Sequence, residues 1–394
     1  MPRWSSPRAL VPAALLLVAL SAGCDAPPAS PSPPAAARAV EPDGQRSWSA
    51  RELETIRSLS LARLGPPPAS PGNAVADDPQ ARSLGARLFH DVRLSARGDV
   101  ACMTCHQAAL HFSDGLPAPL ALDGRKRHTP TLNGVAWSRW QFWDGRADSL
   151  WAQAVQPLFD DLEHGLSPAR LQTLIRRHYA DDYRQVFGRD ADGDPLRVAA
   201  DVGKALEAFQ RQLRPLPSRF DRYVAGLAQD PQPAAPALDA REQAGLALFM
   251  GRGQCLRCHF GPLFTSQGFA NTGLASHLDG RADGGRAEGI VKAARDSFNC
   301  AGAYSDAPPE ACGHLRHLRP NAPEWLGAFK VPTLRGVAFS APYMHDGRFA
   351  TLEAVVDHYR HAPNQDGDYG HSELFPLRLS DDEAAALTAF LKTL

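Results

Sequence analysis

Apolar residues recur at helical spacing in several segments of the chain, among them 205–213 and 218–228. The clearest helix is expected at the end, in "LSDDEAAALTAFLKTL" (379–394). Ser380 is placed to cap its N-terminus, Glu383 completes a capping box, and one face is apolar, formed by Leu387, Phe390, Leu391 and Leu394. Because few segments alternate with the two-residue period of a strand, the sequence predicts a mainly α-helical protein.

Proline-rich stretches divide the chain into parts. Residues 24–76 contain many Pro and Ala and few large apolar side chains, which is typical of a disordered tether, with the spacing of one short helix at 51–64. A second proline-rich joint covers 228–239. We therefore expect two folded domains, 77–235 and 236–394.

The N-terminus has the pattern of an export signal. Arg3 and Arg8 precede the apolar run 11–20, which is too short to span a bilayer, and small residues lead into Cys24. This order predicts a lipoprotein-type signal peptide, 1–23, with Cys24 lipidated; plain cleavage nearby is the alternative. The expected location is the periplasm or cell envelope, with the lipid as the only membrane anchor.

Charge excludes one class of partner. The formal net charge of the 394 residues is −1, and the basic residues form no cluster. Nothing in the sequence therefore predicts a nucleic-acid partner.

Two copies of Cys-x-x-Cys-His carry the chemistry, in "ACMTCHQ" (101–107) and "QCLRCHF" (254–260). A redox dithiol does not need the histidine, and a zinc site built from both pairs would leave both histidines unexplained. A c-type haem uses all three residues, because two thioethers fix the porphyrin and the histidine reaches the iron. The sequence predicts two covalent haems, one held by Cys102, Cys105 and His106 and the other by Cys255, Cys258 and His259.

A weak repeat surrounds the two motifs. "GARLF" (85–89) precedes the first and "GLALF" (245–249) the second, and each motif is followed by Phe and then Ser or Thr, at 112–113 and 264–265. Two copies of one haem-type unit, one per domain, explain this pattern.

Two further cysteines, Cys300 and Cys312, are expected to form a disulfide. Reactive thiols do not persist unpaired in an exported protein. Closing so short a loop stabilises the folded chain by about 3 kcal/mol when the bond is unstrained.

Four blocks resemble the bacterial di-haem cytochrome c peroxidase and MauG family: "RHTPTLNG", "QFWDGRADSLWAQAVQP", "GPLFTSQGFANTGL" and "FKVPTLRGVAFSAPYMHDGRFATLEAVVDHY". The resemblance runs from about residue 77 to the C-terminus. It implies two cytochrome c-like helical domains whose haems face each other across an interdomain interface. It also implies that the N-terminal haem reacts with peroxide and that the C-terminal haem passes electrons.

The resemblance assigns roles position by position. His106 and His259 would be the proximal ligands, and Trp143 would lie between the two haems. Glu163, twenty residues after Trp143, would be the acid–base group that moves a proton between the two peroxide oxygens. Gln153 and Pro157 match the residues that shape this distal pocket.

Two departures separate subgroups of the family. Reductively activated peroxidases hold a loop histidine on the reactive haem, but "HFSDGLPAPLALDG" (111–124) has no histidine at that place, and His111 is too close to His106 to cross the haem. The reactive haem is therefore expected to be five-coordinate.

The second departure is at the other haem. Tyr359 stands where such peroxidases have a methionine ligand, as it does in MauG-like members. Met344 and His358 are the other candidates for the sixth ligand of this haem.

A calcium ion bridges the domains in the family. Ser340 and Pro342 match its backbone ligands, but His128 stands where the family has an asparagine. Because histidine suits a hard cation poorly, calcium is left as an open possibility.

These features predict a di-haem oxidoreductase that reacts with hydrogen peroxide to form high-valent iron and oxidises a partner protein or residue, as MauG-like members do. One alternative is a cytochrome c peroxidase that takes electrons from a small cytochrome or cupredoxin. The other is a non-enzymatic electron-transfer cytochrome with two six-coordinate irons.

Overall fold

The computed structural model describes residues 46–117, 127–229, 237–278, 281–320, 322–362 and 369–394. The predicted signal peptide, Cys24 and the first part of the predicted tether lie outside these residues. Among the described residues, no helix is long and apolar enough to cross a bilayer.

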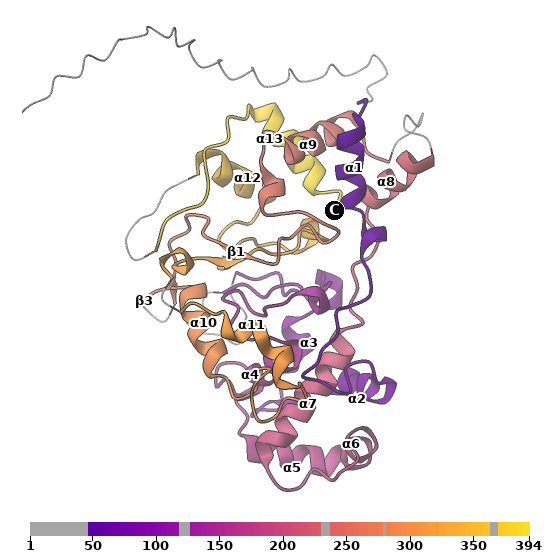
Figure 1. Ribbon diagram of the computed structural model, residues 1–394, viewed down its shortest axis with the longest axis vertical. Helices are drawn as coiled ribbons and strands as arrows, with labels where there is room; N and C mark the ends of the chain where they lie inside the picture. The colour runs from indigo at the N-terminus through magenta and orange to yellow at the C-terminus, as the bar shows by residue number, and fades with distance from the viewer. Residues whose placement is uncertain (1–45, 118–126, 230–236, 279–280, 321, 363–368) are drawn as a thin grey trace, which may run out of the picture. The chain divides into compact units, whose positions relative to one another are not determined.

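α-Helices dominate this part of the chain (Figure 1), as the residue pattern predicted. They are α1 (Ala50–Ser58), α2 (Pro79–Phe89), α3 (Cys102–Cys105), α4 (Leu150–Phe159), α5 (Pro168–His178), α6 (Ala180–Phe187), α7 (Pro195–Gln210), α8 (Arg219–Gln229), α9 (Ala240–Met250), α10 (Arg286–Arg295), α11 (Gly313–Arg316), α12 (Leu352–His361) and α13 (Asp381–Leu391). Short 3₁₀ helices occupy Leu61–Arg63, Val92–Leu94, Ala108–Leu110, Val135–Trp137, Cys255–Arg257, Pro309–Cys312, Pro323–Trp325 and Val337–Phe339. The strands form two antiparallel pairs, β1 (Phe269–Ala270) with β4 (Phe329–Lys330) and β2 (His277–Leu278) with β3 (Arg281–Ala282).

One hydrophobic cluster forms around α7, which buries most of its length. Helices α2, α4 and α5 pack against it. The contact between α2 and α7 requires a glycine, because a Cβ on Gly85 would lie only 1.9 Å from the carbonyl oxygen of Ala205. The glycine of "GARLF", the first copy of the predicted repeat, therefore marks the place where α2 and α7 cross closely.

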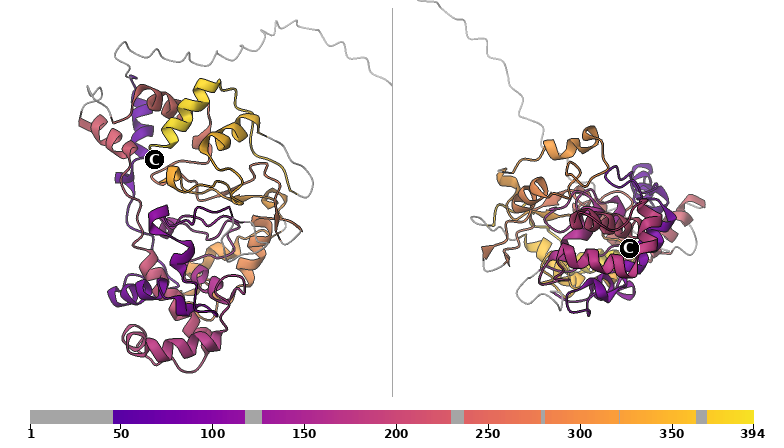
Figure 2. Two further views of the ribbon diagram at one scale, coloured as in Figure 1. Left: turned by 180° about the vertical axis from the view of Figure 1, so that it is seen from behind. Right: turned by 90° about the horizontal axis from the view of Figure 1, so that it is seen from below.

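A second cluster forms around α9 and α13, which lie side by side in Figures 1 and 2. Gly245 allows the same kind of crossing, since a Cβ there would lie 2.0 Å from the carbonyl oxygen of Ala386. Helix α13 has the predicted capping box between Ser380 and Glu383. Four buried rings meet edge to face at centroid distances of 5.3–5.8 Å: Phe220, Phe249, Phe264 and Phe390.

The prediction of a tether over 24–76 is wrong for its described part, 46–76. Helix α1 packs into the second cluster through Ile56, which is fully buried, and Trp48 Nε1 donates a hydrogen bond of 2.6 Å to the hydroxyl of Tyr223. Asn73 is also buried, and its side chain donates to the carbonyl of Lys204 at 3.0 Å. The proline-rich composition hid these contacts because their partners lie far along the chain.

The two clusters also exchange segments across the boundary expected at residue 235. Helix α8 precedes that boundary, yet Phe220 on this helix packs in the second cluster. Phe298 follows it and packs in the first cluster, against Trp151. Burial of apolar area, rather than proline content, decides which core each segment joins.

A longer internal repeat becomes evident once the elements are known. "TPTLNGVAW" (129–137) and "VPTLRGVAF" (331–339) have the same conformation, with Gly134 and Gly336 at φ values of 73° and 69° before matching 3₁₀ helices. At the same offset, Ser149 and Thr351 cap α4 and α12, which have ten residues each. The offset of 202 residues was visible in the sequence and was missed there.

The two repeats contact each other reciprocally. The backbone N–H of His128 donates to the carbonyl of His345 at 2.8 Å, and the N–H of Lys330 donates to the carbonyl of Trp143 at 2.7 Å. Because His128 corresponds to Lys330 and Trp143 to His345, the same bond is made twice with the roles exchanged. The repeats are therefore related by an approximate two-fold operation at this contact.

Candidate functional site

Each Cys-x-x-Cys-His motif lies on a cavity. The first cavity, of about 820 Å³, is lined by Cys102, Cys105 and His106. The second, of about 370 Å³, is lined by Cys255, Cys258 and His259. Both volumes are in the range of cofactor sites in proteins.

Both motif histidines are oriented by a backbone carbonyl. Nδ1 of His106 lies 2.9 Å from the carbonyl oxygen of Phe112, and Nδ1 of His259 lies 2.9 Å from that of Phe264. Because a carbonyl only accepts hydrogen bonds, Nδ1 carries the proton and Nε2 is left with a free lone pair. Burial lowers the pKa of both imidazoles, which favours the neutral form that a metal requires.

The motif cysteines are not arranged as redox dithiols. Burial raises the pKa of the Cys102, Cys105 and Cys255 thiols to about 12 and that of the Cys258 thiol in the same direction. Catalytic Cys-x-x-Cys pairs instead have a lowered thiol pKa. Two cysteines and an oriented imidazole beside an apolar cavity fit covalent haem attachment at each site.

Helix α4 and the turn after it bring the predicted distal residues to the first cavity. Gln153, Pro157 and Glu163 all line this cavity. The N–H of Glu163 donates to the carbonyl of Asp160 at 2.9 Å, and the N–H of His164 donates to that of Pro157 at 3.2 Å. These bonds fold the chain back on the end of α4, so the glutamate is held by a turn rather than by a free loop.

Trp143 lies between the two cavities and lines both of them. The indole is 8% exposed, and its Nε1 donates to the carbonyl of His128 at 2.8 Å. The ring is thus fixed by a backbone contact from the interface of the two repeats.

The second cavity contains Tyr359 and one of its rivals. Tyr359 and Met344 both line it, whereas His358 does not, and the Nε2 atom of His358 lies 2.7 Å from the carbonyl of Thr272. Among the described residues, the hydroxyl of Tyr359 has no hydrogen-bond partner. Burial, with a smaller effect of Cys255 and Cys258, raises the pKa of this phenol.

The internal repeat relates the two distal positions. At the offset of 202 residues, Tyr359 on α12 corresponds to Pro157 on α4. The same helix position therefore presents a phenol to the second cavity and a side chain without any donor atom to the first.

His111 lies outside both cavities. Its ring stacks on Phe339, with centroids 4.6 Å apart, and its carbonyl accepts a hydrogen bond of 2.5 Å from Thr131. Residues 118–126 of the loop that follows lie outside the described residues.

The residues expected to bind calcium are only partly suited to it. Ser340 and Pro342 line the second cavity. Both ring nitrogens of His128 already have partners, Nδ1 with the carbonyl of Leu116 at 3.0 Å and Nε2 with the hydroxyl of Ser113 at 3.3 Å. Both ring nitrogens are therefore engaged with protein atoms rather than directed at an open site, and calcium stays a prediction.

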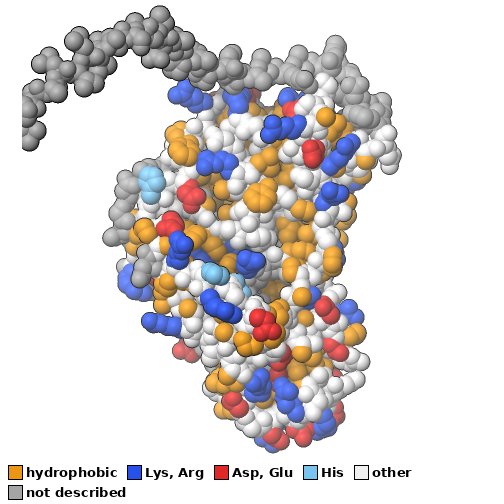
Figure 3. Space-filling view, in the orientation of Figure 1, with side chains coloured by type: hydrophobic (Ala, Val, Ile, Leu, Met, Phe, Trp, Pro, Cys, Tyr) orange, Lys and Arg blue, Asp and Glu red, His pale blue; other side chains and the backbone are white. Residues whose placement is uncertain are grey.

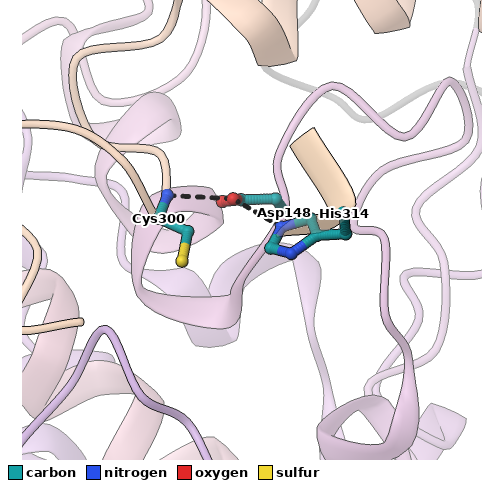
Figure 4. A group of neighbouring side chains, drawn as sticks. All are labelled: Asp148, Cys300 and His314. Atoms are coloured by element: carbon teal, nitrogen blue, oxygen red, sulfur yellow. Dashed lines mark hydrogen bonds and ion pairs between the residues drawn. The ribbon is translucent and has the colours of Figure 1, made fainter. Parts of the chain in front are cut away.

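Cys300 and Cys312 form a disulfide. Figure 4 shows how the bridged loop meets Asp148, just before α4: Asp148 Oδ2 accepts from the N–H of Cys300 at 2.9 Å and lies 3.0 Å from Nε2 of His314. The three side chains are spaced closely enough for a metal, but the sulfur of Cys300 is committed to the disulfide. The bridged loop therefore fixes the position of Asp148, and with it the start of α4.

A buried ionic network beside the first cavity joins the first repeat to the segment just before α10. Arg127 donates to Asp144 at 2.7 Å and to Asp283 at 2.7 and 2.9 Å. Burial alone would raise the pKa of the Asp144 carboxyl, but the guanidiniums of Arg146 and Arg127 lower it far below its usual range. Sequence analysis missed this network because its partners are 17 and 156 residues apart.

Replacing Arg127 by Met should destabilise the fold. Without the guanidinium, the buried carboxylates of Asp144 and Asp283 each lose an ion-pair partner. The free energy of unfolding should therefore fall by about 3–5 kcal/mol. Arg97→Met is the control, because Arg97 and Asp99 form an exposed pair worth less than about 1 kcal/mol. Urea denaturation of the haem-loaded variants measures both; equal losses would contradict the role of the network.

The fold and the two sites define a helical protein that binds two c-type haems. The sequence pattern of the di-haem cytochrome c peroxidases matches residues 79–229. The chain is 34% identical over 320 residues to the methylamine utilization protein MauG of Methylorubrum extorquens, with 80% of this chain and 78% of the relative covered. It is 32% identical over 354 residues to the cytochrome-c peroxidase IdrP1 of Denitromonas iodatirespirans, with 84% and 86% covered.

Solved structures agree with this classification. A MauG-like protein associated with microbial copper homeostasis superposes with a TM-score of 0.61 at 28% identity, covering 84% of this chain and 93% of that one. The diheme peroxidase BthA of Burkholderia thailandensis gives a TM-score of 0.63 at 26% identity, covering 80% and 86%. The chain belongs to the di-haem cytochrome c peroxidase/MauG family and is a peroxidase-type oxidoreductase.

Proposed function

We propose that this protein reacts with hydrogen peroxide at the first cavity and uses the second site to oxidise a partner protein or a residue on it, as a MauG-like enzyme. The observation that carries this proposal is the arrangement of the two cavities, with one buried tryptophan lining both and a glutamate, Glu163, lining only the first. When bound, the haems supply redox-active iron.

The residues of the first cavity would handle the protons of peroxide. Glu163 takes the proton from the peroxide oxygen nearer the iron and returns it to the leaving oxygen, which departs as water. Gln153 and Pro157 bound the same space. The proline matters because it offers no atom that could occupy the coordination position needed by peroxide.

Trp143 would connect the two sites, since its buried indole lines both cavities. Tyr359 would be the second axial ligand of the His259 haem. A phenolate ligand lowers the reduction potential of iron, which suits a site that shares oxidising equivalents rather than accepting electrons from a donor protein.

One observation favours a second candidate, a peroxidase that takes electrons from a small cytochrome or cupredoxin. Met344 lines the same cavity as Tyr359, and a methionine ligand raises the potential of a haem.

On the face shown in Figure 3, side chains of both charges are interspersed. A partner that docks there would rely on shape and apolar contacts more than on net charge.

The proposed location is the periplasm or cell envelope. It follows from the export signal and from haem attachment of the c type. Lipidation of Cys24 is part of this proposal, and mass spectrometry of the mature N-terminus tests it.

Electron paramagnetic resonance of the ferric, haem-loaded protein tests the proposed function. We expect one high-spin and one low-spin signal, both of which fall after one equivalent of peroxide without prior reduction. A methionine-ligated peroxidase that needs reduction first would instead show two low-spin signals that peroxide leaves unchanged, and that result would refute the MauG-like assignment.

A further inference from the structure

Lys330 occupies a special position between the two haem cavities. Six of the described residues line both cavities: His128, Pro130, Thr131, Val135, Trp143 and Lys330. Of these six, only Lys330 has a side chain whose ordinary pKa keeps it positively charged at neutral pH. Its backbone is fixed by β4 and by the hydrogen bond of its N–H to the carbonyl of Trp143.

The ammonium group of Lys330 has no partner among the described residues. Lys330 is half-buried, and it lines both cavities. Burial lowers its pKa to about 8, and no neighbouring charge offsets this effect. An unpaired buried charge is costly, and proteins normally pair it.

Several other buried cations among the described residues have carboxylate partners, and Arg286 donates instead to the backbone carbonyl of Gly145 at 2.6 Å. Arg127 contacts Asp144 and Asp283, and Arg335 contacts Asp221 at 2.5 Å. Lys204, whose side chain is 3% exposed, lies 2.8 Å from Asp306. Lys330 departs from this pattern at the one place where two cofactor cavities meet.

The residue that corresponds to Lys330 in the other repeat shows the contrast directly. His128 makes the reciprocal backbone bond, but both of its ring nitrogens have protein partners. At this interface the side chain of His128 is bound by protein atoms, whereas the ammonium of Lys330 has no partner in the part of the chain that the structure describes and lies at the two cavities.

The missing anion is available from the cofactors. A haem carries two carboxylates on flexible side chains at one edge of the porphyrin, and an ammonium is a compact donor with three N–H groups that can bind more than one carboxylate. Asp144 lines the first cavity beside Trp143, but its carboxylate is already paired with Arg127 and Arg146. It is therefore not the partner of the Lys330 ammonium.

We propose that Lys330 is a shared anchor for the two haems, whose ammonium pairs with a carboxylate of each and places one positive charge between the two irons. The proposal rests on the occupancy of both cavities by haem and not on the peroxide reaction. A nearby positive charge stabilises the reduced form of each iron. The ammonium of Lys330 therefore raises the reduction potentials of both haems.

Spectroelectrochemical titration of the haem-loaded Lys330→Met variant tests this proposal. Both haem midpoints should shift to lower potential, whereas Lys330→Arg, which keeps the charge, should keep both near the values of the unsubstituted protein. Lys292→Met is the matched control, because Lys292 lines only the first cavity and its side chain is half exposed. This control should leave the second midpoint unchanged.

A shift of only one midpoint, or of neither, in Lys330→Met would overturn the shared anchor. If the methionine variant does not take up haem, Lys330→Gln, which is neutral but polar, carries the same expectation. The outcome is independent of the proposed function: unchanged midpoints with peroxide reactivity intact would refute the anchor alone.

Discussion

Replacing Glu163 by Gln should slow the reaction of the ferric protein with hydrogen peroxide by about 10²–10⁴-fold, the range that a positioned acid–base group contributes. The amide keeps the size of the side chain and its place in the turn after α4, but it cannot accept the peroxide proton. The spectra of the two resting haems should change little, because Glu163 is not expected to be a ligand. Stopped-flow absorption after mixing with peroxide measures the rate.

Asp161→Asn is the matched control for this experiment. Asp161 lies in the same turn, is exposed, and does not line the first cavity. Its replacement removes the same charge from the same segment and should leave the rate within about a factor of two, as expected for a surface substitution. A Glu163→Gln variant that reacts as fast as the unsubstituted protein would mean that another group moves the proton; His164, buried beside the same cavity, would be the next residue to replace.

Replacing Tyr359 by Phe should change the coordination of the second haem and leave the first untouched. The substitution removes only the hydroxyl, which has no hydrogen-bond partner among the described residues. The low-spin ferric signal should be lost or replaced, and the midpoint of the second haem should rise because a phenolate no longer stabilises ferric iron. Electron paramagnetic resonance and potentiometry measure the two effects.

Tyr343→Phe separates ligation from packing. Tyr343 lines the same cavity, but its hydroxyl donates to the carbonyl of Val337 at 2.9 Å. This control should lose one hydrogen bond, about 1 kcal/mol, and keep the low-spin signal. An unchanged spectrum in Tyr359→Phe would eliminate the tyrosine ligand and leave Met344 as the residue to test.

Local patterns determined much of the helical structure and the chemistry of attachment. Ser380 and Glu383 are three residues apart, so the start of α13 could be predicted from the capping box they form. The two Cys-x-x-Cys-His motifs are equally local. Their cysteines and histidine reach the same cavity because they are neighbours in sequence.

Contacts between distant residues could not be predicted in this way. The tether prediction failed for 46–76 because Trp48 and Ile56 find their partners on α8 and in the second cluster, more than 150 residues away. The resemblance to a family supplied Glu163 and Trp143, which local chemistry alone would have left as a surface acid and a core ring. The 202-residue repeat lay in the sequence, but only the paired elements gave it meaning.

The sequence by itself determined that this protein has helical segments, two haem-attachment motifs and two imidazoles to bind iron, because each depends on residues a few positions apart. The tertiary structure decided which residues share a cavity with each motif, since Glu163, Tyr359, Trp143 and Lys330 meet their sites only when α4, α12 and the repeat interface pack. It also decided that the ammonium of Lys330 has no partner among the described residues, although it lines both cavities. Burial and pairing of charge are properties of the packed chain, and no local pattern encodes them.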